Sequence, residues 1–172
     1  MTLRTILIHP DPRLRKSCAR IDTFDAKLRS LADDMLETMY DAPGVGLAAP
    51  QIGLTRQLLV MDCSDKEEPQ TPCILINPEI SWESEETHTY EEGCLSIPEQ
   101  YGDVTRPERV RVRFHDIDGV EQEEEFDGLW STCVQHEIDH LRGKLFIDYL
   151  SAMKRTMITN KMKKLKKERA RA

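Results

Sequence analysis

The segment QHEIDHLRG, residues 135–143, most constrains what this chain can fold into. It contains His136, Glu137 and His140, and in a helix two residues four positions apart lie on one face, one turn apart. Two imidazoles on one face suit a transition metal, and a catalytic metal usually has three protein ligands and one open position. The rest of the chain must therefore supply a third ligand.

Three segments have the patterns of helices. Residues 24–42 place apolar side chains at helical spacing before Pro43-Gly44, and residues 128–143 carry the HExxH motif and end at a glycine. Ser151 is expected to cap a final helix through the basic tail.

Strands are predicted for the short apolar or alternating segments 57–63, 73–78, 81–90 and 109–126. In the last of these, Asp118-Gly119 stands where a hairpin turn is expected. Helices and strands in irregular order predict an α+β fold. We expect small antiparallel or mixed sheets around a central HExxH helix, with an N-terminal helix and a C-terminal basic helix.

Length and cysteine usage favour a single cytoplasmic domain. The chain has 172 residues, no apolar run long enough to span a membrane, and an N-terminus that does not resemble a signal peptide. An odd number of scattered cysteines without a CxxC pair argues against a disulfide framework. We therefore expect one domain over 1–172, with 151–172 as a basic helical extension.

The net charge of −7 is unevenly distributed. Residues 152–172 carry nine basic residues and one acid, a net +8, so the remainder carries −15. The acidic body argues against DNA as a partner, whereas the basic tail could be a solvated helix face or could bind nucleic acid.

The third ligand has one strong candidate. His9, His88 and His115 are expected to be surface or capping histidines, because none lies in a segment that suits ligation. Cys94 lies in EEGCLSIPE after a glycine that allows the backbone to bend or to be approached closely. Its thiolate would complete a Cys-His-His set and leave a fourth position open.

A second glycine-rich segment, GVGLAAPQIG (44–53), is neither a phosphate loop nor a dinucleotide fingerprint. Its small residues allow close approach of a backbone or substrate. Gln51 is its one side chain able to donate a hydrogen bond. The segment is therefore either a plain tight loop or a substrate wall in which Gln51 is an oxyanion donor.

Together, GVGLAAPQIG, EEGCLSIP and QHEIDHLRG resemble, in order and separation, the three signature motifs of the peptide deformylases. The similarity continues into HPDPRLR, FDGLW and KLFIDYLS, and so covers essentially the whole chain. It implies removal of the formyl group from the N-terminal formyl-methionine of new polypeptides. In this family the metal ligands fall on Cys94, His136 and His140, and the general base and acid on Glu137.

The resemblance also assigns the rest of the site. Oxyanion contacts fall on the Gln51 side chain and the Leu95 backbone N–H, and an ion pair of Glu92 with Arg106 supports the cysteine loop. The peptide would lie along the backbone near Val45, Gly46 and Gly93. The methionine pocket would be formed by Val45, Tyr90, Leu129, Thr132, Cys133 and the His136 ring.

Two positions depart from common family patterns. Tyr101 stands where some members have an arginine that contacts the substrate backbone, and Thr132 is more polar than the usual aliphatic residue.

One thiolate and two imidazoles accept Fe(II), Zn, Ni or Co. The family favours iron in vivo, and its bacterial members use the C-terminal helix to dock on the ribosome, which suits the charge of +8.

Two other classes share features of the sequence. HExxH also occurs in zinc endopeptidases, although an upstream cysteine ligand and the short chain argue against that class. A non-catalytic metal-binding module would need four protein ligands and would give Gln51 and Glu137 no role.

Overall fold

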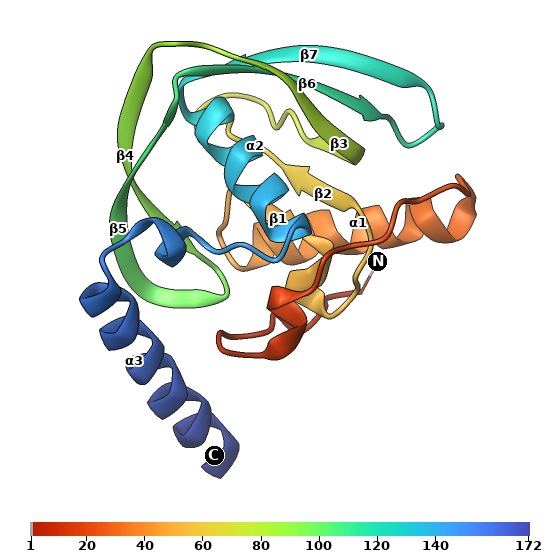
Figure 1. Ribbon diagram of the computed structural model, residues 1–172. Coiled ribbons are helices and arrows are strands. Elements are labelled where there is room, and N and C mark those ends of the chain that lie inside the picture. The colour runs from red at the N-terminus through yellow and green to blue at the C-terminus, as the bar shows by residue number, and fades with distance from the viewer. Residues whose placement is uncertain (1) are drawn as a thin grey trace.

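The computed structural model describes residues 2–172 and has an α+β fold (Figure 1). Within these residues the α-helices are α1 (Ala26–Asp41), α2 (Gly128–Leu141) and α3 (Ala152–Arg171). The strands are β1 (Gly46–Ala48), β2 (Leu58–Met61), β3 (Cys73–Glu83), β4 (Thr87–Cys94), β5 (Ile97–Pro107), β6 (Arg109–His115) and β7 (Glu121–Asp127). Short 3-10 helices are η1 (Pro12–Arg15), η2 (Ala49–Ile52) and η3 (Phe146–Tyr149).

The strands form two antiparallel sheets around α2. One sheet has the order β1-β2-β3-β6-β7, and the other is the β4–β5 pair. Figure 1 shows α2 in the centre of the molecule, with strands of both sheets on several sides. The helix is therefore enclosed, as the sequence predicted.

The strand β2 is buried on both faces because a helix covers each side of its sheet. Leu59 and Met61 belong to the core that includes residues of α2, and Leu58 and Val60 belong to the core that includes residues of α1. This alternation explains why the segment is a continuous apolar run. Strand β1, which pairs with β2, and η2, which follows β1 in the chain, both contact α2.

All three predicted helices and the 118–119 hairpin are confirmed within a few residues. The single strand predicted over 81–90 is wrong, because the chain leaves the larger sheet after Glu83 and enters the smaller one at Thr87. Strand β5 was missed. Its inward-facing positions include Gly102 and Arg106, so the apolar alternation typical of a half-buried strand is absent.

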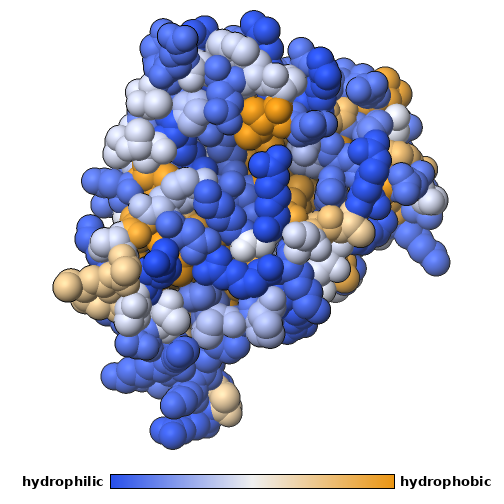
Figure 2. Space-filling model, in the orientation of Figure 1, coloured by the Kyte–Doolittle hydropathy of each residue, from blue (hydrophilic) through white to orange (hydrophobic). Residues whose placement is uncertain are grey.

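The helix α3 begins at Ser151, whose hydroxyl accepts a hydrogen bond from the Lys154 amide at 3.2 Å. Ile158 and Met162 are buried in a core with Ile8 and Phe146, so the first half of the helix packs on the body. Figures 1 and 2 show its C-terminal half projecting away, with a mainly hydrophilic surface. Among the helices of the described residues, none has the length and apolar character needed to cross a membrane.

Candidate metal centre and active site

The helix α2 positions three of the predicted site residues. His136, Glu137 and His140 are all buried, with at most 8% of their surface exposed. The two imidazole rings lie edge to face with their centroids 5.0 Å apart, as the i, i+4 spacing requires. The opposite side of the helix carries Val134 and Ile138, which pack into the core against the larger sheet.

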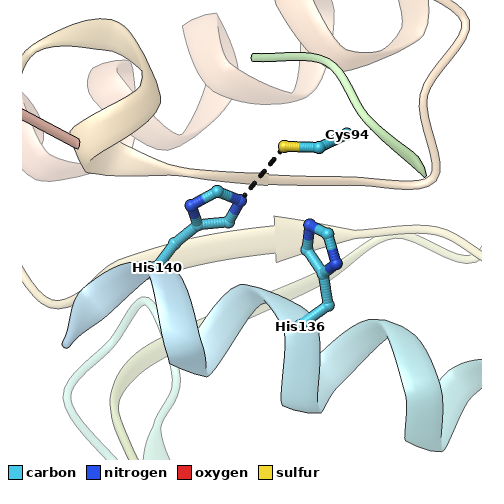
Figure 3. Close-up of side chains that lie close together, drawn as sticks. All are labelled: Cys94, His136 and His140. Carbon is cyan, nitrogen blue, oxygen red and sulfur yellow. Dashed lines mark hydrogen bonds between the residues drawn. The ribbon is translucent and has the colours of Figure 1, made fainter. Parts of the chain in front are cut away.

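The thiol of Cys94 reaches these rings from the end of β4 (Figure 3). A register irregularity between Glu92 and Cys94 turns the strand end. A Cβ at position 93 would lie 2.8 Å from the Tyr101 ring, so a larger residue there would displace that ring. Cys94 Sγ lies 3.4 Å from His140 Nε2.

The three side chains have the geometry of a metal-ligand set. One donor atom each from Cys94, His136 and His140 lies within 4.8 Å of the other two. A tetrahedral ion with bonds of about 2.0–2.3 Å places neighbouring donors about 3.5 Å apart, close to the observed sulfur–nitrogen distance. Among the described residues this group has three members, which leaves a fourth position for water or substrate.

A buried carboxylate orients His136. The Nδ1 atom of His136 lies 2.9 Å from Glu92 Oε1, so the Nε2 atom is left for a metal ion. Hydrogen bonds to Cys94 and Glu92 outweigh burial and raise the pKa of His136 well above its usual value. A cation bound at Nε2 would displace that proton. Burial lowers the pKa of His140 and keeps its ring neutral, the form that binds metals.

Arg106 holds Glu92 in place and is itself buried. Its guanidinium donates to both oxygens of Glu92, at 2.7 and 3.0 Å, and to Asp139 at 2.9 Å. Although burial favours a neutral Glu92, hydrogen bonds from His136 and Arg106 hold the pKa of that carboxyl below its usual value. The predicted ion pair is present, and its link through Asp139 to Tyr149, at 2.8 Å, was not foreseen.

Glu137 is next to the ligand group but has a different environment. Its Oε1 atom lies 4.0 Å from His136 Nε2, and its buried Oε2 atom has no hydrogen-bond partner in the described part of the chain. Burial raises the pKa of this carboxyl to about 7. A buried carboxyl at the wall of a cavity, with a pKa raised toward neutrality, suits proton transfer.

The side chain of Gln51 is fixed at both ends. Its Oε1 accepts a hydrogen bond from the Ala48 amide at 2.9 Å. The Nε2 group therefore points toward Ser96 Oγ, at 3.1 Å, and Cys94 Sγ, at 3.5 Å. The role of Ser96 as the partner of Gln51 was missed, because no local pattern links residues 45 positions apart.

Two cavities meet at this centre. The larger, about 460 Å³, is lined in part by Gly46, Gln51, Cys94, Leu95 and Glu137. The smaller, about 160 Å³, is lined by all the residues predicted for the methionine pocket: Val45, Tyr90, Leu129, Thr132, Cys133 and His136. Gly93 lines both cavities. The structure therefore brings together every site residue that the sequence singled out.

The remaining histidines lie outside the ligand group. His9 was expected to be a surface or capping histidine, but it is buried, with its Nε2 atom 2.9 Å from Thr159 Oγ1 on α3. His115 lies near Asn77, with the nitrogen atoms 3.5 Å apart. His88 points toward α2 and contacts Thr132.

An enclosed HExxH helix, with a cysteine thiol close to both histidines and a buried glutamate beside them, is typical of a metal-dependent hydrolase. The model of the polypeptide deformylase family matches residues 3–156. A peptide deformylase of Rhizobium meliloti (strain 1021) is 52% identical over 169 residues, 98% of this chain and 97% of that protein. The chain belongs to the polypeptide deformylase family.

Solved structures agree with this assignment. The crystal structure of a peptide deformylase from Legionella pneumophila superposes with a TM-score of 0.90 at 47% identity, covering 99% of both chains. The peptide deformylase from Ehrlichia chaffeensis gives a TM-score of 0.93 at 36% identity, covering 98% of this chain and 99% of that one.

Proposed function

We propose that this chain removes the formyl group from the N-terminal formyl-methionine of new polypeptides and releases formate and a free methionine amine. The observation that carries the proposal is the donor group of Cys94, His136 and His140 with the unpaired Glu137 carboxylate beside it. A formamide has a weakly electrophilic carbon and a poor amine leaving group. Its hydrolysis therefore needs an activated water, a stabilised oxyanion and a proton for the departing nitrogen.

We assign the metal to this donor group on its chemistry. A bound divalent cation lowers the pKa of water toward neutrality and polarises the formyl oxygen. One thiolate and two imidazoles form a borderline-soft set, and we propose Fe(II) as the ion in the cell, with Zn, Ni or Co able to substitute.

Glu137 is assigned as the general base and acid. Its Oε1 atom, 4.0 Å from His136 Nε2, faces the ligand group and would accept a proton from the attacking water and return it to the leaving nitrogen. Burial, which raises the pKa of this carboxyl to about 7, favours uptake of a proton by Glu137.

Gln51 Nε2 and the Leu95 backbone N–H are assigned as donors to the oxyanion. The Ala48 amide fixes the Gln51 carboxamide before substrate binds, so the donor needs no reorientation. A preorganised donor of this kind contributes about 3 kcal/mol to transition-state stabilisation.

The two cavities support a binding mode for the peptide. We propose that the methionine side chain enters the smaller cavity and that the peptide backbone lies along Val45, Gly46 and Gly93. A Cβ at position 46 would lie 2.7 Å from Glu137 Oε1, so glycine keeps this edge open to a peptide. Tyr101, 63% exposed beside the larger cavity, would contact residues beyond the methionine without supplying a charge.

The test compares a formylated methionyl peptide with the same peptide without the formyl group, using metal-loaded protein. We expect one equivalent of formate from the formylated peptide. The peptide bonds of both peptides should stay intact. Cys94→Ser should lose most of the bound metal and the activity, whereas Cys133→Ser, a control thiol, should keep the metal. Cleavage of the unblocked peptide would favour the zinc endopeptidase, and no reaction in any metal form would favour a non-catalytic module.

We also propose that the chain is one cytoplasmic domain and that the basic face of α3 binds ribosomal RNA. All five cysteines are free, which suits a reducing compartment. Deleting α3 would expose the core around Ile158 and Met162, so charge neutralisation is the sharper test. A variant in which Lys161, Lys163, Lys164 and Lys167 are glutamine should keep peptide activity but lose salt-dependent ribosome co-sedimentation. Unchanged co-sedimentation would contradict RNA binding.

A further inference from the structure

The histidine at position 88 contacts two walls of the smaller cavity from outside it. His88 Nε2 lies 2.8 Å from the hydroxyl of Thr132 on α2. Its ring also packs edge to face against Tyr90, with the ring centroids 4.6 Å apart. Thr132 and Tyr90 both line the cavity, and His88 does not.

We propose that His88 is a positioning residue that sets the shape of the methionine pocket by fixing the rotamer of Thr132. This inference rests on the proposed function of the smaller cavity as the methionine pocket. His88 touches neither the metal ligands nor the cavity space, so its effect on substrate passes through Thr132 and Tyr90.

The strand and helix geometry supports this role. His88, Tyr90 and Glu92 alternate along β4 and share the face that points toward α2. His88 contacts Thr132, and Glu92 contacts His136 one helical turn later. These two hydrogen bonds join the same face of β4 to α2, one at His136 and one at the cavity wall.

Threonine in a helix can adopt two χ1 rotamers, whereas an aliphatic β-branched residue has one strongly preferred rotamer. Its hydroxyl can bond to a backbone carbonyl three or four residues earlier, and the side chain therefore divides between two χ1 rotamers. In this structure Thr132 is only 5% exposed, and its hydroxyl is paired with His88 instead. Fixing the hydroxyl also fixes the γ-methyl group, and with it the local width of the cavity.

The experiment is a double-mutant cycle with His88→Ala and Thr132→Val, assayed with formyl-Met and formyl-Leu peptides. We expect His88→Ala to raise KM for the formyl-Met peptide by about three- to tenfold with kcat little changed, because one neutral hydrogen bond contributes that much to binding. The ratio of kcat/KM for the formyl-Met peptide to kcat/KM for the formyl-Leu peptide should fall, because the pocket no longer has a fixed width.

The effect of His88→Ala in the Thr132→Val protein distinguishes a positioning role of His88 from general structural support. Valine has the shape of threonine but no hydroxyl to orient, so His88→Ala should have almost no effect in the Thr132→Val protein. His88→Gln, which retains a hydrogen-bonding group, should restore most of the wild-type KM. Metal content should be equal in all variants.

Three results would overturn the inference. They are an equal effect of His88→Ala in the wild-type and Thr132→Val proteins, a fall in kcat with KM unchanged, and an unaltered preference between the two peptides. Absence of deformylase activity in the wild-type protein would instead refute the proposed function, so the two failures are distinguishable.

Discussion

Arg106→Met tests how far the fold depends on the buried ion pair behind the metal site. Both side chains of the Arg106–Glu92 pair are 4% exposed, and two hydrogen bonds of 2.7 and 3.0 Å join them. Methionine fills much of the same volume without charge, so Glu92 keeps only His136 as a partner. Asp139, 14% exposed, also loses a bond but can be hydrated.

The expected loss comes mainly from the uncompensated charge of Glu92. Removing one partner of a buried pair costs about 3–5 kcal/mol. For a chain of this size, each kcal/mol lowers Tm by about 2–4 °C, so we expect a decrease of about 6–20 °C. Adding Glu92→Gln should recover a large part of the loss, because a neutral amide still accepts from His136 Nδ1 but needs no counter-charge.

The assay is denaturant unfolding with the same cation bound to every variant. Arg111→Met is the matched control, since Arg111 is 49% exposed and lies 3.2 Å from Glu125, and a surface pair contributes about 0–1 kcal/mol. A loss below about 1 kcal/mol for Arg106→Met would refute the reasoning. So would a double variant as unstable as the single one.

Three further predictions follow from other parts of the site and fold. Glu137→Gln should retain its metal by elemental analysis but lower kcat by about 10²–10⁴-fold, and loss of metal would make Glu137 a ligand. Gly46→Ala should lower kcat/KM by about a hundredfold, because the new Cβ would displace Glu137 Oε1. Unchanged kinetics would show that the backbone at position 46 moves instead of Glu137. Burial and the charge of Arg15 lower the pKa of His9 to about 4, so the unfolded chain takes up the proton first as pH falls. Unfolding free energy should therefore decrease from pH 6.5 toward pH 4, and His9→Gln should flatten that slope.

The parts of the fold that the sequence predicted are those with local causes. Residues 24–42 and 128–143 have apolar residues at helical spacing, and Asp118-Gly119 forms its turn from neighbouring residues. Strand β5 could not be predicted this way because Arg106 occupies an inward-facing position. That arginine is buried only because Glu92 and Asp139, from two other elements, meet it there. Contacts of this kind depend on the assembled fold.

The same distinction applies to the site. The HExxH spacing places His136 and His140 on one face of any helix. The glycine before Cys94 indicates a place where the backbone bends or is approached closely. The partners that orient these groups carry no such signal. Ser96 beside Gln51 and His88 beside Thr132 are ordinary residues until the β4–β5 pair folds over α2.

The buried network behind the ligands is better explained by orientation than by stability. A well-packed apolar replacement of a buried ion pair is often as stable as the pair itself, so stability alone does not account for Arg106 and Glu92. An apolar residue at position 92, however, would leave His136 Nδ1 without an acceptor and free the ring to rotate. With Glu92 held by Arg106, the Nε2 lone pair of His136 is directed toward Cys94 and His140. The charge pair therefore contributes to the site by fixing the direction of one imidazole, and this is also why both of its members need to be buried.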